Sequence, residues 1–271
     1  DTKDKKVVWS DRWQEKWDNL PNIKTSLSDG LLKALDTKPK VEKKVDTTNP
    51  EAYEFYLKAK HKYNKRENTD DTEIVRGLLN KAIELDDNLI SAKNLIGTTY
   101  LEMGDYDDAM EIYTSTLKQA EELGNKFGMV DALINIGNVH TRKGDNDKAL
   151  DYYNKSLTIL EELVAKNGIG RCLMNIGVIH NSRGDYDKAL DYYNKSLTIL
   201  EELGDKIGMA ANLNNIGNLY NNKDSYEEAL DYYSRSLEIS KEFGDKHGMG
   251  VSFFSIGNIY NQKEDLDKAL D

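Results

Sequence analysis

Asparagine side chains recur at fixed steps along the second half of the chain, and their amides are its most repeated polar groups. A carboxamide both donates and accepts hydrogen bonds, so a row of them can bind the backbone of an extended peptide. Asparagine is an ordinary-to-poor helix former, so this repetition needs a reason beyond local propensity. The alternative interpretation is that the amides only solvate a groove or bond to one another. The predicted peptide-binding residues are Asn135, Asn138, Arg142, Arg171, Asn175, Asn215, Asn218, Asn222, Asn258 and Asn261.

Two arginines belong to this set, Arg142 and Arg171. A guanidinium group binds a carboxylate through two parallel hydrogen bonds, so either residue could anchor an acidic side chain of a ligand. A single charge on a solvated helix is also compatible with an ordinary surface residue. Both interpretations stay open for the two arginines.

Histidine and cysteine do not form a recognisable reactive site. His140 and His180 occupy a position that holds tyrosine in other copies of the same pattern, which favours packing. Cys172 occupies a position of mostly small residues, which favours a buried thiol over a nucleophile. The sequence contains no Ser-His-Asp arrangement, phosphate-binding glycine loop or dinucleotide motif. We therefore predict that the chain is not an enzyme, with no catalytic residue and no cofactor.

Closely spaced aspartates resemble the start of a calcium loop. The pattern Asp145-x-Asp147 occurs again 40 residues later, but Ala149 and Leu150 stand where a further ligand and a glycine are needed. We therefore predict no metal site. We expect these aspartates instead to cap the helix that follows them and to stabilise its positive end.

Composition limits the classes of partner. The chain has 271 residues, with 48 acidic against 37 basic ones and a formal net charge of −11. This charge disfavours nucleic acid and anionic membranes, so we predict a protein or peptide partner that is neutral or basic. No segment approaches the roughly 18 apolar residues of a membrane span, and a single cysteine cannot form an internal disulfide. We expect cytoplasmic residence.

The elements that must position the asparagines follow from a repeat of 40 residues. Residues 147–163 recur without change at 187–203. Apolar residues at helical spacing on both sides of Lys143-Gly144-Asp145 predict two amphipathic helices per unit. We therefore predict an all-α fold of antiparallel helix pairs. A glycine that follows an isoleucine marks each unit: Gly97, Gly137, Gly177, Gly217 and Gly257.

The pattern IGNVHTRKGDNDKALDYYNKSL, which starts at Ile136, resembles the tetratricopeptide repeat. The unit departs from the family's usual 34 residues by a longer second helix and by Gly-Asp-Lys-x-Gly in place of the closing proline. Such extended units resemble those of kinesin light chains and of adaptors that orient mitotic spindles. The resemblance implies a right-handed superhelical solenoid that binds a protein or peptide in its concave groove. The matching residues are Leu133, Gly137, His140, Gly144, Ala149, Tyr153 and Ser156.

The chain begins at Asp1 without methionine and stops at Asp271 inside a repeat, so we expect it to be part of a longer protein. We expect Asn49-Pro50 to start the first helix of an irregular unit. The expected divisions are an N-terminal helical segment and linker at 1–45, an irregular unit at 46–89, repeats at 90–129, 130–169, 170–209 and 210–249, and a truncated repeat at 250–271.

The three tryptophans, Trp9, Trp13 and Trp17, would form one stripe on a helix. They either pack against the first repeat or contact an upstream domain or another subunit. This N-terminal segment resembles the one that precedes the repeats in bacterial multidomain signalling proteins, some with class III nucleotide cyclase domains. The alternative to a binding scaffold is therefore a regulatory or oligomerisation segment of a larger signalling enzyme.

Apolar residues near the end of the chain predict self-association. Phe253, Phe254 and Ile256 lie on a helix whose partner helix stops at Asp271. Apolar surface that a complete repeat would cover is then exposed. We expect the chain to self-associate through this truncated repeat.

Overall fold

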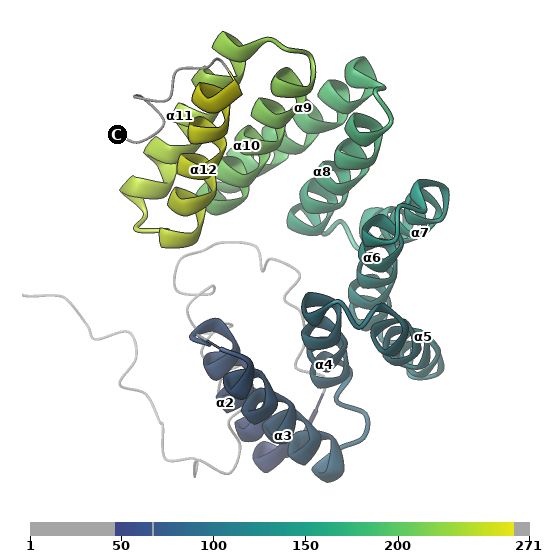
Figure 1. Ribbon diagram of the computed structural model, residues 1–271. Coiled ribbons are helices and arrows are strands. Elements are labelled where there is room, and N and C mark those ends of the chain that lie inside the picture. Colours follow the sequence, from purple (N-terminus) through teal and green to yellow (C-terminus); the bar gives the residue numbers. More distant parts are fainter. Residues whose placement is uncertain (1–46, 67, 263–271) are drawn as a thin grey trace, which may run out of the picture. The chain divides into compact units, whose positions relative to one another are not determined.

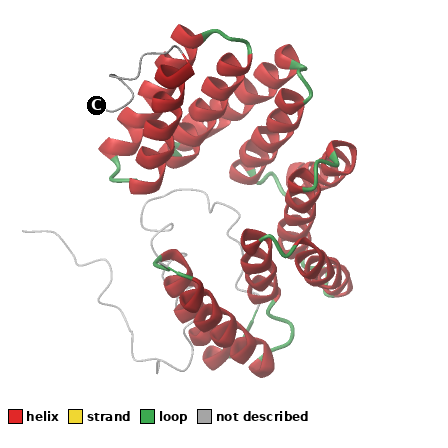
Figure 2. Cartoon of the chain, in the orientation of Figure 1, coloured by secondary structure: helices red, strands yellow, loops and turns green. Residues whose placement is uncertain are grey.

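A computed structural model describes residues 47–66 and 68–262, and every regular element in these ranges is an α-helix (Figures 1 and 2). The chain divides into two compact units between Val139 and His140. Within the described ranges, no helix is both long and apolar enough to cross a membrane. The segment 1–45, with the predicted tryptophan stripe, lies outside the described residues.

The first unit begins where the sequence predicts a helix. The Asn49 side chain accepts hydrogen bonds from the backbone N–H groups of Glu51 and Ala52, and Pro50 stands in the first turn. Successive helices then pack on one another, α2 on α3, α3 on α4 and α4 on α5. The helices of this unit are α2 (Pro50–Asn64), α3 (Thr69–Leu85), α4 (Ile90–Met103), α5 (Tyr106–Glu122) and most of α6 (Lys126–Arg142).

The second unit repeats one arrangement of helix pairs. Each helix from α7 to α12 contacts the next one along the chain, and α10 also contacts α8 and α12. The first helices of successive pairs, α8, α10 and α12, therefore lie side by side (Figure 1). We call them the first-helix layer, and we call α7, α9 and α11 the second helices. The bounds are α7 (Asn146–Glu162), α8 (Lys166–Ser182), α9 (Tyr186–Leu203), α10 (Lys206–Asn222), α11 (Tyr226–Glu242) and α12 (Lys246–Gln262).

A tyrosine ring packed on a glycine holds each of these pairs together. Tyr193 and Tyr233 are both 1% exposed. A Cβ atom on Gly177 would lie 2.6 Å from Cε1 of Tyr193, and one on Gly217 would lie 2.5 Å from Cε1 of Tyr233. Both distances are far inside van der Waals contact. Glycine is therefore required for the close approach of the two helices at these positions.

The Gly-Asp-Lys-x-Gly segment ends one pair and starts the next, as predicted. Gly204 adopts φ 66° after the last turn of α9, a left-handed conformation that glycine adopts without steric cost. Asp205 then caps α10, because its Oδ1 accepts a hydrogen bond from the backbone N–H of Gly208 at 2.9 Å. The five residues of this segment therefore include both the end of one helix pair and the first turn of the next.

Val164 takes the place of this glycine in the preceding unit. Its φ is 52°, close to the 62° of Gly124 and the 66° of Gly204 and Gly244 at the equivalent positions. A side chain with a Cβ atom is strained in the left-handed region by about 1–2 kcal/mol, and branching at Cβ adds to the crowding. Val164 is 70% exposed, so the contacts of its side chain in the folded state offset little of this strain.

We expect Val164→Gly to raise the free energy of unfolding by about 0.5–1 kcal/mol, after subtracting the larger backbone entropy of glycine in the unfolded chain. Urea unfolding followed by circular dichroism measures the change. The control is Val178→Gly, inside α8, which must lose stability. Similar losses at both positions would show that Val164 is not strained.

Candidate functional site

The first-helix layer brings predicted asparagines from three helices onto one face. Steps of three or four residues keep the set on one side of each helix, and the contacts of α10 with α8 and α12 place these sides next to one another. Asn135 and Asn138 lie on α6 in the first unit, and Arg142 ends that helix in the second unit. The predicted residues on the layer are Arg171 and Asn175 of α8, Asn215, Asn218 and Asn222 of α10, and Asn258 and Asn261 of α12.

Some of these amides have no hydrogen-bond partner among the described residues. Asn175 and Asn215 are half-buried, and their side chains make no hydrogen bond to any described residue. The same holds for Asn135 on α6 and Asn258 on α12 within the described ranges. These four side chains are available to a ligand without loss of an internal bond.

Other asparagines of the set also hold the fold together. The hydroxyl of Tyr233 donates to Oδ1 of Asn218 at 2.8 Å, which ties α11 to α10. Nδ2 of Asn222 donates to Oδ1 of Asn181 at 3.2 Å, which ties α10 to α8. Substitution of Asn218 or Asn222 would therefore disturb the layer as well as any ligand contact.

Two asparagines beside the set have enclosed polar atoms, and neither is among the predicted peptide-binding residues. Asn214 is 6% exposed and its Nδ2 is buried without a hydrogen-bond partner, as is Oδ1 of Asn221. An enclosed polar atom without a partner costs about 1–3 kcal/mol, and an atom that solvent does not reach is not accessible to a ligand in this conformation either. Helical spacing places Asn214 one turn before Asn218, beside the face.

The sequence contains an indication that Asn214 is special, but the apolar residues at the equivalent positions of other units make it hard to recognise. The equivalent positions of neighbouring units hold Ile134, Met174 and Phe254, which indicate packing. Asn94 stands at the same position three units earlier, is 5% exposed, and both polar atoms of its amide are buried without a partner. The recurrence of asparagine at this position, 120 residues apart, would have indicated a second polar row.

Charge is divided unequally between the helices of the second unit. The three helices of the first-helix layer contain no aspartate or glutamate. In contrast, α7 and α9 each contain four acidic and two basic residues, and α11 contains five and two. The negative charge of this unit therefore belongs to the second helices and to the connections between helices, and not to the three helices of the candidate face.

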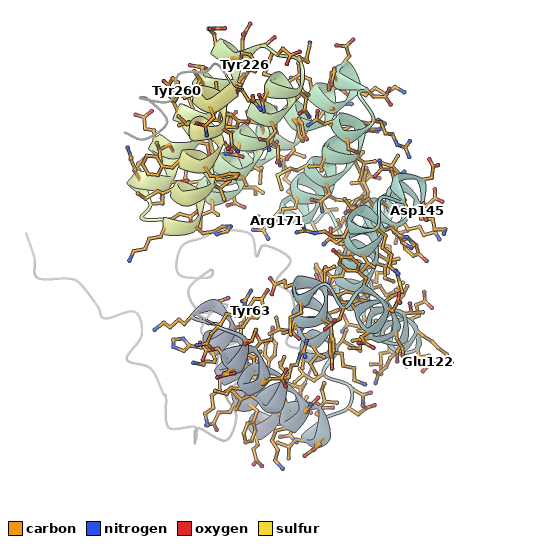
Figure 3. The ribbon with its side chains drawn as sticks, in the orientation of Figure 1. Tyr63, Glu122, Asp145, Arg171, Tyr226 and Tyr260 are labelled. Carbon is orange, nitrogen blue, oxygen red and sulfur yellow. The ribbon has the colours of Figure 1, made fainter. Side chains whose placement is uncertain are left out.

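Arg171 is a cation on this face that has no anionic partner among the described residues. It is exposed and forms no ion pair with a described residue, and Figure 3 shows its side chain extending away from α8. It precedes the unpartnered Asn175 by one helical turn. Arg142 is likewise exposed without an ion pair in the described part of the chain.

The family of the chain follows from a comparison with protein-family models. A model described as tetratricopeptide repeat matches residues 88–162, 128–202 and 208–271, which together exceed half of the chain. The chain belongs to the tetratricopeptide repeat family. This membership confirms the predicted fold class, an all-α solenoid of antiparallel helix pairs.

Solved structures share this tetratricopeptide fold at low sequence identity, which shows the fold alone. BtubC from P. vanneervenii has a TM-score of 0.57 and 18% identity over 80% of this chain and 86% of its own. A Rap protein complexed with competence and sporulation factor has a TM-score of 0.63 and 16% identity over 90% and 76%. A signal transduction ATPase with a tetratricopeptide repeat sensor, from Pyrococcus horikoshii, has a TM-score of 0.63 and 16% identity over 93% and 38%. The comparison with curated proteins finds no match.

The remaining polar residues of the tetratricopeptide units have structural roles. Cys172 is fully buried, its Sγ lies 3.1 Å from the carbonyl oxygen of Tyr153, and burial raises the pKa of its thiol to about 12. The predicted burial of this thiol is confirmed. At the equivalent position of the next unit, Nδ2 of Asn212 donates to the carbonyl oxygen of Tyr193 at 2.9 Å.

The two histidines pack as aromatic rings, as predicted. His140 stacks on Tyr152 with ring centroids 5.5 Å apart, and His180 stacks on Tyr192 at 5.3 Å. Burial lowers the pKa of His140 below its ordinary value, against the opposing effect of Asp145. The imidazoles therefore belong to the interface between the two helices of a tetratricopeptide unit.

The aspartates of the Asp-x-Asp pattern lie at helix starts. Oδ1 of Asp145 accepts from the backbone N–H of Lys148 at 3.4 Å and so caps α7, with Asp147 in the first turn. Asp185 stands at the N-cap position of α9, but its side chain makes no capping hydrogen bond, so the predicted cap is wrong at this residue. Its Oδ2 lies 3.3 Å from Nδ1 of His180 instead. Across the described ranges, no group of three His, Cys, Asp or Glu side chains could hold a metal ion.

At one edge of the first-helix layer, α12 exposes aromatic rings. Phe254 is 71% exposed and Phe253 is 51% exposed, whereas Ile256 is half-buried. Nζ of Lys241 lies 5.5 Å from the centre of the Phe253 ring. Residues 263–271 lie outside the described part of the chain. Self-association of the chain through this surface stays a prediction.

Proposed function

We propose that this tetratricopeptide chain is a protein-interaction scaffold that binds an extended peptide segment on its first-helix layer. The observation that carries the proposal is the set of unpartnered amide groups there. Asn175 and Asn215 are half-buried, and their side chains make no hydrogen bond to a described residue. An extended peptide presents one N–H and one C=O group per residue, so it can bond both to the oxygen and to the nitrogen of such an amide.

One structural neighbour supports the capacity of this fold to hold a partner. The Rap protein is described in complex with competence and sporulation factor. Its 16% identity to this chain identifies no shared contact residue. The residues proposed here therefore depend on their own geometry. Asn258 and Asn261 on α12 extend the proposed contacts beyond α8 and α10.

The proposal predicts that Asn175→Ala combined with Asn215→Ala weakens peptide binding about tenfold, since each lost hydrogen bond contributes about 0.5–1.5 kcal/mol. Stability should not change, because neither side chain has an internal partner. Peptides enriched by the parent chain from a displayed random library provide the probes. Fluorescence anisotropy of the labelled peptides gives the dissociation constants.

The chain offers a matched control for this experiment. Asn154 and Asn194 are exposed on the second helices α7 and α9, so Asn154→Ala with Asn194→Ala removes two amides away from the face. This control variant should bind like the parent. The proposal fails if no peptide is enriched over the bare support, or if both double variants bind the enriched peptides equally.

A second proposal is that the chain forms the regulatory or oligomerisation segment of a larger signalling enzyme, such as a nucleotide cyclase. The signal transduction ATPase neighbour favours it, because that protein carries a tetratricopeptide repeat sensor and the present chain spans only 38% of its length. Trp9, Trp13 and Trp17 would then contact the upstream domain or another subunit. The coding sequence upstream of Asp1 tests this proposal, which an immediately preceding start codon would contradict.

A further inference from the structure

The division of charge in the second unit indicates which peptides the face selects. We infer that the first-helix layer takes extended peptides that are uncharged except for one acidic side chain, which pairs with Arg171, and that it rejects basic peptides. This inference rests on the proposed peptide-binding function. It reverses the neutral or basic partner expected from the net charge of −11.

The net charge is a poor guide to this face because the acidic residues lie elsewhere. None occurs on α8, α10 or α12, whereas α7, α9 and α11 are all acidic. The axes of packed helices are about 8–10 Å apart, so carboxylates on the far side of the second helices are more than about 10 Å from a ligand on the face. The Debye length at physiological ionic strength is about 8 Å. A bound peptide therefore responds mainly to the charges of the face itself.

Asp205, at the edge of the first-helix layer, is engaged at a helix end. Asp205 stands at the start of α10, where its Oδ1 accepts from the backbone N–H of Gly208 and its Oδ2 accepts from Nδ2 of Asn167 at 3.0 Å. Its charge stabilises the positive end of that helix. A basic ligand side chain over the middle of the layer would find no such carboxylate.

Arg171 lies within the row of unpartnered amides, unlike the lysines of the layer. Lys166, Lys206 and Lys246 each begin a helix, and Lys166 pairs with Glu202 at 2.8 Å. The free guanidinium of Arg171 can bind a carboxylate through two parallel hydrogen bonds, while Asn175 one turn later reaches the adjoining peptide group. A lysine or arginine of a ligand at the same place would face a like charge.

Beyond Arg171, the layer favours uncharged side chains. Asn215 and Asn218 present amides on α10, and Val251 and Phe254 present exposed apolar groups on α12. A charged ligand side chain placed there would lose hydration without gaining an opposite charge. The expected ligand therefore carries one acidic residue next to an uncharged segment.

The test uses a peptide enriched by the parent chain from a random library, with its acidic residue then changed to glutamine or to lysine. We expect binding to the parent to weaken about fivefold for the glutamine peptide and further for the lysine peptide. Arg171→Glu should reverse the order, so that the lysine peptide binds more tightly than the acidic one. Lys188→Glu, which makes the same charge change on α9, should preserve the parent's order.

The outcomes separate this inference from the proposed function. If the enriched peptides are basic, or if Arg171→Glu leaves the order unchanged, the charge selection is wrong. The peptide-binding proposal survives that result as long as the Asn175→Ala, Asn215→Ala variant still weakens binding. A basic peptide that binds all these variants equally would be held by the acidic second helices, and both proposals would fail.

Discussion

The second unit should unfold cooperatively as the pH rises from about 10 to about 12, because tyrosines buried in its helix pairs resist ionisation. Burial raises the pKa of Tyr153 and of Tyr233 to about 12 and also raises that of Tyr193. These rings are 2%, 1% and 1% exposed. The folded unit therefore holds protons that the unfolded chain has already released.

The sign of the effect follows from the two pKa values of each tyrosine. An unfolded tyrosine ionises near its ordinary pKa of about 10, so below that pH both states are protonated and stability is constant. Between about 10 and 12 the unfolded state loses the proton first, and the free energy of unfolding falls with rising pH. A difference of about two units corresponds to about 2.7 kcal/mol, so Tyr153 and Tyr233 together account for about 5 kcal/mol. That is comparable to the whole stability of a small domain.

The measurement follows tyrosinate absorbance and helical circular dichroism over the same pH range. The two signals should change together for the buried tyrosines. Tyr233→Phe should move the alkaline transition to higher pH, because one ionising group is removed. At neutral pH the same variant should lose about 1 kcal/mol, since the hydrogen bond from the Tyr233 hydroxyl to Asn218 is lost. Complete ionisation of the tyrosines with the helices intact would contradict the prediction.

The fold could be predicted because each of its features depends on residues close together in one unit. The Asn49-Pro50 cap, the glycine that follows an isoleucine in each unit and the Gly-Asp-Lys-x-Gly break are local, and the structure shows the role of each. The burial of Cys172 followed from comparison of equivalent positions. Periodicity alone therefore predicts which residues face a neighbouring helix.

The contacts of each asparagine could not be predicted in this way, because they depend on which side chain stands on the next element. Tyr193 and Tyr233 are equivalent, yet Tyr233 bonds to Asn218 while Tyr193 pairs with Asn181. The reason is visible at the position of Asn218 in the preceding unit, where Val178 offers no acceptor. Two asparagines of one predicted row can thus differ in whether they are available to a ligand.

The sequence already shows that the helices of the candidate face contain no acidic residue, but a count of charges over the whole chain does not reveal it. Summed over 271 residues, the acidic excess predicts a neutral or basic partner. Counted helix by helix, the same residues leave α8, α10 and α12 without a carboxylate. In a repeat protein the two helices of a unit meet different surroundings, so a charge count has meaning only for each helix.

Gly217→Ala should lower the free energy of unfolding by up to about 2 kcal/mol, although alanine is the better helix former. The gain in helix propensity is about 1 kcal/mol. The added Cβ would lie 2.5 Å from Cε1, 2.6 Å from Cδ1 and 3.1 Å from Cζ of Tyr233, so it meets the side of a buried ring and not a flexible chain end. Overpacking of this kind costs about 1–3 kcal/mol or more and outweighs the propensity.

Gly250→Ala provides the opposite case in the same unit. Gly250 lies within α12, and a Cβ there would meet nothing within 4 Å. We therefore expect no loss of stability and a gain of up to about 1 kcal/mol. Urea unfolding followed by circular dichroism compares the two variants. If Gly217→Ala were as stable as Gly250→Ala, the ring of Tyr233 would not lie against the backbone of α10.

Recovery of part of the loss when Gly217→Ala is combined with Tyr233→Leu would identify the ring as the cause, because the two changes then act on one contact.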